Sequence, residues 1–266
     1  MNLIQTLSLI AKPFSQTIFR RINRWAADTW WSWCDLSAKK LYRIQIILTG
    51  ENLPIGENSI VILNHQSMAD IPVVFSIAKE KGRLGDLKWF VKDTLKYVPG
   101  IGWGMLFLDC LFVKRDWTAD REHVCRIFKK FLTDSIPLWL MIFVEGSRFR
   151  PETLRRSREY AEKNHFEPYR HLLFPRTKGF TASVDSLRTH IDAVYDLTIG
   201  YVNGTPTLWM WITGKVRSVH VHIRRFPIDQ LPRQETALSQ WLLERFREKD
   251  LLLDQFYKKG AFSAPS

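Results

Sequence analysis

The sequence predicts an α/β fold, with a single domain built on a mixed sheet flanked by helices and preceded by amphipathic helices. Short apolar runs rich in β-branched residues alternate along the chain with segments of helical periodicity, which is the pattern of strands joined by covering helices. The 266 residues provide enough material for a large core. A hydrophobic content of 45% with 25% charged residues excludes wholesale disorder.

The expected strands are short and are followed by polar residues. Continuous apolar runs predict buried strands at 59–63 and 138–144. Further strands are expected at 193–202, 207–213 and 216–223, and helices at 71–81, 121–134, 179–189 and 234–257. Open α/β sheets bind ligands beyond the carboxyl ends of their strands. The residues that follow the two buried strands are therefore the first candidates for a functional site.

The N-terminal segment 1–48 combines positive charge with tryptophan. It contains seven Lys or Arg against two Asp, and four of the 11 Trp lie between positions 25 and 33. Basic residues mixed with Trp, Phe and Leu at helical spacing are typical of a helix in a lipid interface. The alternative is that these Trp pack onto the core. We expect amphipathic membrane-interface helices over 1–48 and the main domain over 49–266.

No segment predicts a membrane span or a cleavable signal. The longest uncharged run, 197–214, is interrupted at 203–206, where the sequence predicts a turn. Lys12 and Pro13 end the first uncharged stretch well short of the roughly 20 residues that a span needs. Three Cys are too few for a disulfide framework and indicate a reducing compartment. Membrane association is therefore expected to be peripheral (monotopic), on a cytoplasmic face.

The net charge of +12, from 39 Lys and Arg against 27 Asp and Glu, indicates an anionic partner. Nucleic acid, an anionic membrane surface and a phosphorylated substrate all fit, and simple solubility also accounts for the charge. The sequence has no Cys-x-x-Cys or His-x-x-x-His pair, so no metal site is predicted. It has no Gly-x-Ser-x-Gly motif, which leaves a serine hydrolase without its nucleophile.

The first candidate site is the segment from Asn64 to Asp70, which follows the strand expected at 59–63. Histidine supplies a base near neutral pH, and a carboxylate can fix the tautomer of the ring and stabilise its cation. Residues five apart in one helix point about 140° away from each other. The pair therefore requires His65 in the turn after the strand and Asp70 one turn inside the following helix.

A second candidate is the segment 145–148, which follows the strand expected at 138–144. Its glycine, Gly146, lets the backbone approach a ligand closely. Arg148 offers a planar fork that suits phosphate. A solvated basic loop is the alternative, and the strand-end position favours a site at Arg148.

Two more segments place cations beside apolar or glycine-rich sequence. The stretch 88–115 could line an acyl-chain groove with basic residues such as Lys92 and Arg115 at its mouth, although its composition alone fits a buried helix–turn–strand better. Lys178 lies in a basic turn that leads into a helix. The N-terminus of a helix with nearby cations can hold an anion.

Taken together and in this order, the segments resemble the glycerolipid acyltransferase family, whose members acylate lysophosphatidic acid and other lysophospholipids. The family's Asn-His-x-x-x-x-Asp pattern falls on His65 and Asp70, and its Glu-Gly-Thr-Arg pattern falls on 145–148, with Ser147 in place of Thr. The family block that lies between these two patterns ends in Phe-x-x-Arg, which here ends at Arg115. The spelling of these blocks is most similar to the lysocardiolipin and lysophosphatidate acyltransferase branch.

Two features depart from the family pattern. The last block usually contains an apolar residue followed by Pro, whereas the strand here ends Gly200-Tyr201-Val202, so we expect no catalytic residue there. Relatives often carry N-terminal transmembrane helices, and this sequence predicts none. The basic, Trp-rich N-terminus would then have to provide the membrane contact.

The resemblance implies an enzyme that moves a fatty acyl group from acyl-CoA or acyl-carrier protein to the free glycerol hydroxyl of a lysophospholipid, in phospholipid biosynthesis or remodelling. It implies His65 as general base and Asp70 as its partner, without a covalent intermediate and without a cofactor besides the thioester co-substrate. It also implies a set of residues that bind the phosphorylated acceptor: Glu145, Gly146, Ser147, Arg148, Arg115, Lys92 and Lys178.

Two other functions remain as alternatives. A basic nucleic-acid-binding protein fits the charge, but the sequence has no recognition motif and its basic residues do not form one stripe. A non-catalytic lipid-binding relative is disfavoured by the intact His65 and Asp70. The expected partners are therefore a lysophospholipid acceptor, an acyl thioester donor and an anionic membrane surface, and not nucleic acid.

Overall fold

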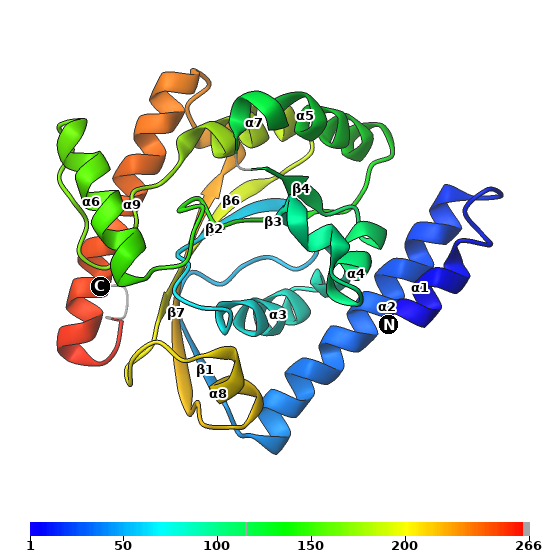
Figure 1. The fold of residues 1–266 in the computed structure, drawn as a ribbon, viewed down its shortest axis with the longest axis horizontal. Coiled ribbons are helices and arrows are strands. Elements are labelled where there is room, and N and C mark those ends of the chain that lie inside the picture. The colour runs from blue at the N-terminus through cyan, green and yellow to red at the C-terminus, as the bar shows by residue number, and fades with distance from the viewer. Residues whose placement is uncertain (115, 263–266) are drawn as a thin grey trace.

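A mixed sheet forms the centre of the computed structural model, which describes residues 1–114 and 116–262 (Figure 1). Within these residues the sheet has seven strands in the order β1-β7-β6-β2-β5-β3-β4. They are β1 Gln45–Gly50, β2 Ser59–Leu63, β3 Leu87–Lys92, β4 Leu111–Val113, β5 Trp139–Ile142, β6 Ala193–Gly200 and β7 Ser218–Pro227. β6 and β7 are antiparallel, and the other described pairs are parallel. The predicted α/β fold is confirmed.

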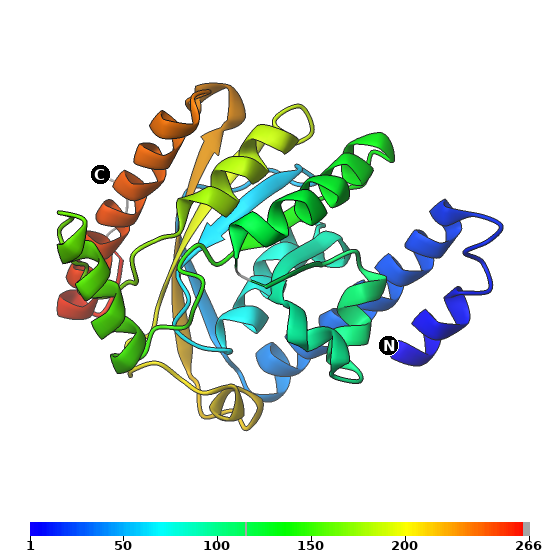
Figure 2. The same ribbon diagram turned by 45° about the horizontal axis from the view of Figure 1, so that its top comes forward.

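Helices cover both faces of the sheet (Figures 1 and 2). The described helices are α1 Asn2–Ser8, α2 Gln16–Leu36, α3 Asp70–Glu80, α4 Ile101–Phe107, α5 Trp117–Thr133, α6 Pro151–Lys163, α7 Thr177–Leu187, α8 Leu208–Ile212 and α9 Glu235–Lys259. Because side chains alternate along a strand, β2 contributes to two cores. Val61 and Leu63 pack on the side of α2 and α3, and Ile60 and Ile62 on the side of α5, α7 and α9.

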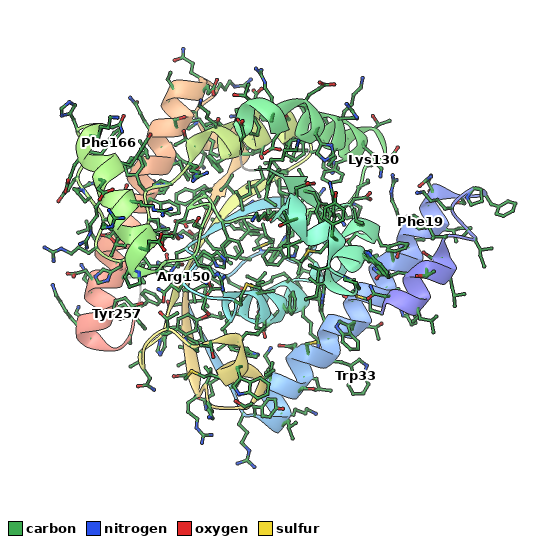
Figure 3. The ribbon with its side chains drawn as sticks, in the orientation of Figure 1. Phe19, Trp33, Lys130, Arg150, Phe166 and Tyr257 are labelled. Atoms are coloured by element: carbon green, nitrogen blue, oxygen red, sulfur yellow. The ribbon has the colours of Figure 1, made fainter. Side chains whose placement is uncertain are left out.

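The four N-terminal Trp divide between the two environments considered above. Trp31 stacks on Phe75 of α3, with ring centroids 5.0 Å apart. Trp25, Trp30 and Trp33 are each more than half exposed, at 58%, 52% and 64%. In Figure 3, Trp33 points away from the sheet. One Trp therefore fastens α2 to the domain, and three lie on its outer side.

A bidentate ion pair holds the middle of α2 against the domain. The guanidinium of Arg24 donates to both carboxylate oxygens of Asp86, at 2.6 and 2.9 Å. Asp86 belongs to the 3₁₀ turn Leu84–Asp86, and the neighbouring Gly85 lies directly against the backbone of α2. This side of α2 is therefore packed onto the turn before β3.

The structure differs from the sequence prediction in several elements. The segment 207–213, expected as a strand, forms the short helix α8, because the hydroxyl of Thr207 caps it by accepting the N–H of Met210 at 3.1 Å. Strands β1, β3 and β4 and helix α6 were not predicted. β1 begins at Gln45, so the division expected at residue 48 falls inside this strand.

Within the described residues, no helix combines the length and the apolar character that crossing a membrane requires.

Candidate active site

His65 and Asp70 lie together at the carboxyl end of β2. β2 ends at Leu63, His65 lies in the following loop, and Asp70 is the first residue of α3 rather than one turn inside it. The Nδ1 atom of His65 is 2.9 Å from Oδ2 of Asp70. The His65 side chain is 13% exposed and that of Asp70 is fully buried. The strand-to-helix turn therefore forms the hydrogen-bonded pair that the sequence predicted.

Stacking on Phe143, together with the bond to Asp70, fixes the plane of the histidine ring. Phe143, just after β5, stacks on His65 with ring centroids 3.8 Å apart and planes inclined by 22°. The bond to Asp70 occupies Nδ1. With Nδ1–H donating to the carboxylate, the lone pair of Nε2 is free to accept a proton. The arrangement suits a base that acts through Nε2.

Asp70 accepts more hydrogen bonds than the pairing with His65 requires. Its Oδ2 accepts the backbone N–H groups of Gln66 and Ser67, at 2.8 and 2.9 Å. Its Oδ1 accepts the hydroxyl of Tyr201, at 2.8 Å. Burial, together with the charge of Asp70, raises the pKa of Tyr201 well above its usual range, which keeps the phenol a donor. The carboxylate is therefore held on both oxygens.

Tyr201 is a site residue that the sequence reasoning dismissed. It follows the last residue of β6, the neighbour of β2 in the sheet, and is 2% exposed. The missing Pro of the family pattern led us to expect no catalytic residue there. Its place after a strand end was a signal that could have found it.

The loop that carries His65 is fastened to β6 and α9. The side-chain amide of Asn64 bonds both backbone groups of Ile199, at 2.9 and 2.8 Å. The amide nitrogen of Gln66 lies 2.9 Å from the hydroxyl of Tyr257 in α9. The residues on either side of His65 are therefore fixed from two elements that are distant in sequence.

Glu145 lies behind the histidine loop. Its Oε1 accepts the backbone N–H of His65 at 2.7 Å, and its Oε2 accepts that of Leu173 at 2.8 Å. Only 3% of the residue is exposed. Burial raises the pKa of Glu145 to about 8, against the lowering effect of the two N–H groups and of Lys249. The structure thus leaves Glu145 almost no surface with which to contact a substrate.

Gly146 and Arg148 lie nearer the solvent than Glu145 and are partly exposed, as is Ser147. Gly146 has a φ of +67°, and a Cβ there would lie 3.1 Å from the side chain of Arg176. The backbone N–H of Arg176 in turn bonds the carbonyl of Val144 at 2.7 Å. Arg176 is exposed and was not selected from the sequence. The structure therefore adds a second guanidinium beside the glycine.

Two of the remaining predicted cations, Lys92 and Lys178, are exposed along the same edge or beside it. Lys92 is the exposed last residue of β3, which runs parallel to β5. Parallel strands end on one edge of a sheet, so Lys92 shares the edge of His65. Lys178 is exposed in the first turn of α7. Arg115 lies outside the described residues.

The chemistry available at this edge is that of a general base. No group of three or more His, Cys, Asp or Glu in the described part of the chain is arranged to hold a metal ion. A histidine stacked on an aromatic ring and paired with a buried carboxylate, next to exposed cations, suits removal of a proton from a hydroxyl of an anionic substrate. The fold and this site define an α/β enzyme with a histidine–carboxylate pair at the carboxyl edge of its sheet.

Comparison with known proteins identifies the family. The model of the family described as "Acyltransferase" matches residues 45–201, and that described as "Acyltransferase C-terminus" matches residues 211–266. The protein therefore belongs to the acyltransferase family.

Named relatives cover almost the whole chain. The chain is 33% identical to 1-acyl-sn-glycerol-3-phosphate acyltransferase 3 of Arabidopsis thaliana, over 99% of this chain and 72% of the relative. It is 33% identical to 1-acyl-sn-glycerol-3-phosphate acyltransferase gamma of Mus musculus, over 98% of this chain and 71% of the relative. It is also 33% identical to lysocardiolipin acyltransferase 1 of Danio rerio, over 91% of this chain and 65% of the relative.

A solved structure shares the fold. The 1-acyl-sn-glycerophosphate acyltransferase PlsC of Thermotoga maritima superposes with a TM-score of 0.53 at 17% identity, covering 92% of this chain and 87% of the other. The predicted resemblance to the glycerolipid acyltransferases is confirmed.

Proposed function

We propose that the protein transfers a fatty acyl group from acyl-CoA or acyl-carrier protein to the free glycerol hydroxyl of lysophosphatidic acid or a related lysophospholipid, in phospholipid biosynthesis or remodelling. The names of the relatives support this acceptor class. The observation that carries the proposal is the 2.9 Å contact between His65 and Asp70, at an edge of the sheet where the exposed Lys92 also lies.

In the proposed reaction, Nε2 of His65 removes the proton of the acceptor hydroxyl as its oxygen attacks the thioester carbonyl. The new C–O bond forms, the C–S bond breaks, and the thiolate takes the proton back from the imidazolium. Asp70 stabilises that imidazolium through Nδ1. General-base catalysis of this kind contributes about 10²–10⁴-fold in rate. No covalent intermediate is needed.

We assign the phosphate of the acceptor to the cations that the sequence selected. Arg148 and Arg115 are the first choices, with Lys92 and Lys178 as the second, because guanidinium groups bind phosphate with two donors. Gly146 and Ser147 would line the same position. The geometry adds Arg176, whose side chain lies 3.1 Å from where a Cβ of Gly146 would be.

Glu145 has a different role in this proposal from the other residues of the predicted acceptor-binding set. Its two oxygens accept backbone N–H groups from the His65 loop and from Leu173, and the residue is 3% exposed. We therefore assign it to positioning His65 rather than to direct contact with the acceptor.

The N-terminal helices within 1–48 would contact the membrane peripherally, on the cytoplasmic face. The acyltransferase domain would then begin with β1 at Gln45 rather than at 49. Supporting the membrane contact, α1 and α2 enclose an apolar groove of about 470 Å³ lined by Ile4, Trp25, Trp30 and Trp33. Leu3, Leu7, Ile10 and Phe14 around α1 are also strongly exposed. Trp, Phe and Leu beside basic residues favour an anionic lipid interface rather than nucleic acid.

The decisive experiment measures acylation by the full-length protein with acyl-CoA and a panel of lysophospholipids, with products identified by mass spectrometry. We expect one acceptor class to gain a single acyl chain, and His65→Ala to abolish that product while circular dichroism stays unchanged. His123→Ala, an exposed histidine of α5, is the matched control and should keep full activity. If His65→Ala retained turnover, His65 would not be the general base.

A further inference from the structure

The short helix α8 presents apolar side chains to solvent. One of its residues, Trp211, faces the core and is 4% exposed. The other four are between 36% and 66% exposed: Leu208, Trp209, Met210 and Ile212. The hydroxyl of Thr207 caps the first turn, and that of Thr213 donates to the carbonyl of Trp209 at 2.8 Å. The apolar side chains are thus displayed by an anchored helix.

α8 lies beside the end of the N-terminal helices, as both ribbon views show (Figures 1 and 2). Gly214, just after α8, has a φ of +69°, and a Cβ there would meet the ring of Tyr42 at 2.6 Å. Tyr42 directly follows the helical turn that extends α2, in which Leu41 is 70% exposed. The apolar surface of α8 therefore adjoins the end of α2.

The surroundings of α8 are positively charged. Neither 37–50 nor 197–217 contains an acidic residue. Lys40, Arg43, Lys215 and Arg217 are all exposed. Exposed apolar residues ringed by Lys and Arg complement the apolar and anionic layers of a membrane surface.

The same loop connects α8 with the catalytic segment. Thr205 donates to the amide oxygen of Gln66 at 3.0 Å, and Gln66 is the neighbour of His65. Tyr201, at the start of the loop, donates to Asp70. A surface that contacts α8 would therefore be connected to the histidine segment through this one loop.

We propose that α8 is a second membrane-insertion element. Its apolar side chains enter the lipid interface next to the end of α2, and the four flanking cations contact anionic headgroups. Together the two elements dock the catalytic edge against the surface that supplies the lysophospholipid. The proposal rests on the proposed lipid acceptor and on peripheral membrane binding, and it adds a contact that neither requires.

A lipid surface fits α8 better than a protein partner does. Stable protein interfaces take about 20–30 residues from each side, whereas α8 offers four exposed side chains on one short helix. Insertion into a lipid interface needs only a few apolar side chains beside basic residues.

The test places an environment-sensitive fluorophore at Trp209→Cys in the full chain. Cys34→Ala and Cys125→Ser remove the two cysteines that are not buried. We expect phosphatidylcholine vesicles with phosphatidylglycerol to shift the emission to the blue, and spin-labelled acyl chains to quench it. The matched control is Phe166→Cys, also exposed and on the other side of the molecule from α8 (Figure 3), which should do neither.

A second measurement separates docking from chemistry. The variant Leu208→Ser/Trp209→Ser should bind the same vesicles about tenfold more weakly in a sedimentation assay. The control Tyr160→Ser, at an exposed aromatic residue of α6, should bind as the unmodified protein does. The α8 variant Leu208→Ser/Trp209→Ser should lose turnover on a vesicle-borne acceptor and keep turnover on a short-chain acceptor dissolved as monomers. Loss on both acceptors would place α8 in the catalytic structure and overturn the proposal.

Two other results also overturn it, and a third decides on the proposed function instead. If the label at 209 stays water-exposed while the protein sediments with vesicles, the N-terminal helices bind alone. If the label becomes shielded without vesicles as the protein is concentrated, the partner of α8 is a second copy of the chain. If no acceptor is acylated in any form, the proposed function fails, whatever the label reports.

Discussion

At the residue scale, the proposed catalytic pair, His65 and Asp70, depends on how Asp70 is held. We expect Tyr201→Phe to lower kcat by about tenfold with little change in KM, because a buried hydrogen bond to a carboxylate contributes about 1.5–3 kcal/mol and this one acts only through His65. Steady-state kinetics on one acceptor would show the split.

Tyr195→Phe is the control for that change. Tyr195 lies on β6, the strand that precedes Tyr201; it is fully buried and donates to the carboxylate of Glu57, away from the site. Both variants lose a phenol–carboxylate bond, so both lose stability, but only Tyr201→Phe should lose turnover. Equal kinetic effects would mean that Tyr201 acts through stability alone.

The buried carboxyl of Glu145 predicts a pH dependence of stability. Its pKa is about 8 in the folded protein against 4.5 as the ordinary value, so the folded state holds the proton more tightly. Its contribution to stability is therefore complete below about pH 4.5 and is lost as the pH rises through about 8. Between about pH 5 and pH 8 the loss is on the order of 3 kcal/mol.

Glu145→Gln tests this, because glutamine does not titrate. The variant loses stability at every pH, since its NH₂ group faces a backbone N–H, but that loss is a constant offset. We expect the stability advantage of the unmodified protein over the variant to shrink as the pH rises, measured by urea unfolding at several pH values. A difference that grows with pH would show that Glu145 is ionised in the folded protein.

Two residues show what the sequence leaves undetermined at this scale. His65 and Asp70 could be predicted because both lie in one short segment directly after an apolar strand. The contacts of Tyr201 and Glu145 join segments 131 and 80 residues apart, and only the order of β6, β2 and β5 in the sheet brings them together. Local pattern carries no information about that order.

At the element scale, the packing of α2 on the turn before β3 is a close backbone contact. A Cβ added at Gly85 would lie 2.7 Å from the carbonyl oxygen of Arg24, so Gly85→Ala forces α2 away from the domain. We expect a loss of about 1–3 kcal/mol in the free energy of unfolding. Gly179→Ala in α7, where no atom lies within 4 Å, is the control and should be neutral or stabilising.

The same scale explains the errors in secondary structure. The segment 207–213 has the Trp, Ile and Thr content of a strand, but the cap by Thr207 and the packing of Trp211 form a helix instead. β1 has the apolar composition of a strand, yet it directly follows the helical N-terminus, and its place is set by pairing with β7, which lies far along the chain. Such long-range pairing cannot be seen in the local sequence.

At the scale of the whole molecule, α9 joins the C-terminal region to the edge of the sheet that carries His65. Tyr257 of this helix contacts Gln66, and Lys249 is fully buried beside Asp196 of β6, with its ammonium donating to the carbonyl of Leu197 at 2.6 Å. Burial lowers the pKa of Lys249, and Asp196 opposes that change. The site therefore depends on a helix that is distant from His65 in the sequence.

That dependence predicts the effect of Lys249→Met. Removing one partner of a buried ion pair leaves the other charge uncompensated, which typically costs about 3–5 kcal/mol. Arg224 also pairs with Asp196 and offsets part of that cost, so we expect a loss of about 3 kcal/mol in urea unfolding. Asp196→Asn/Lys249→Met should lose less than the sum of the single changes, because no unpaired charge remains. Additive losses would mean that the two side chains do not stabilise the fold as a pair.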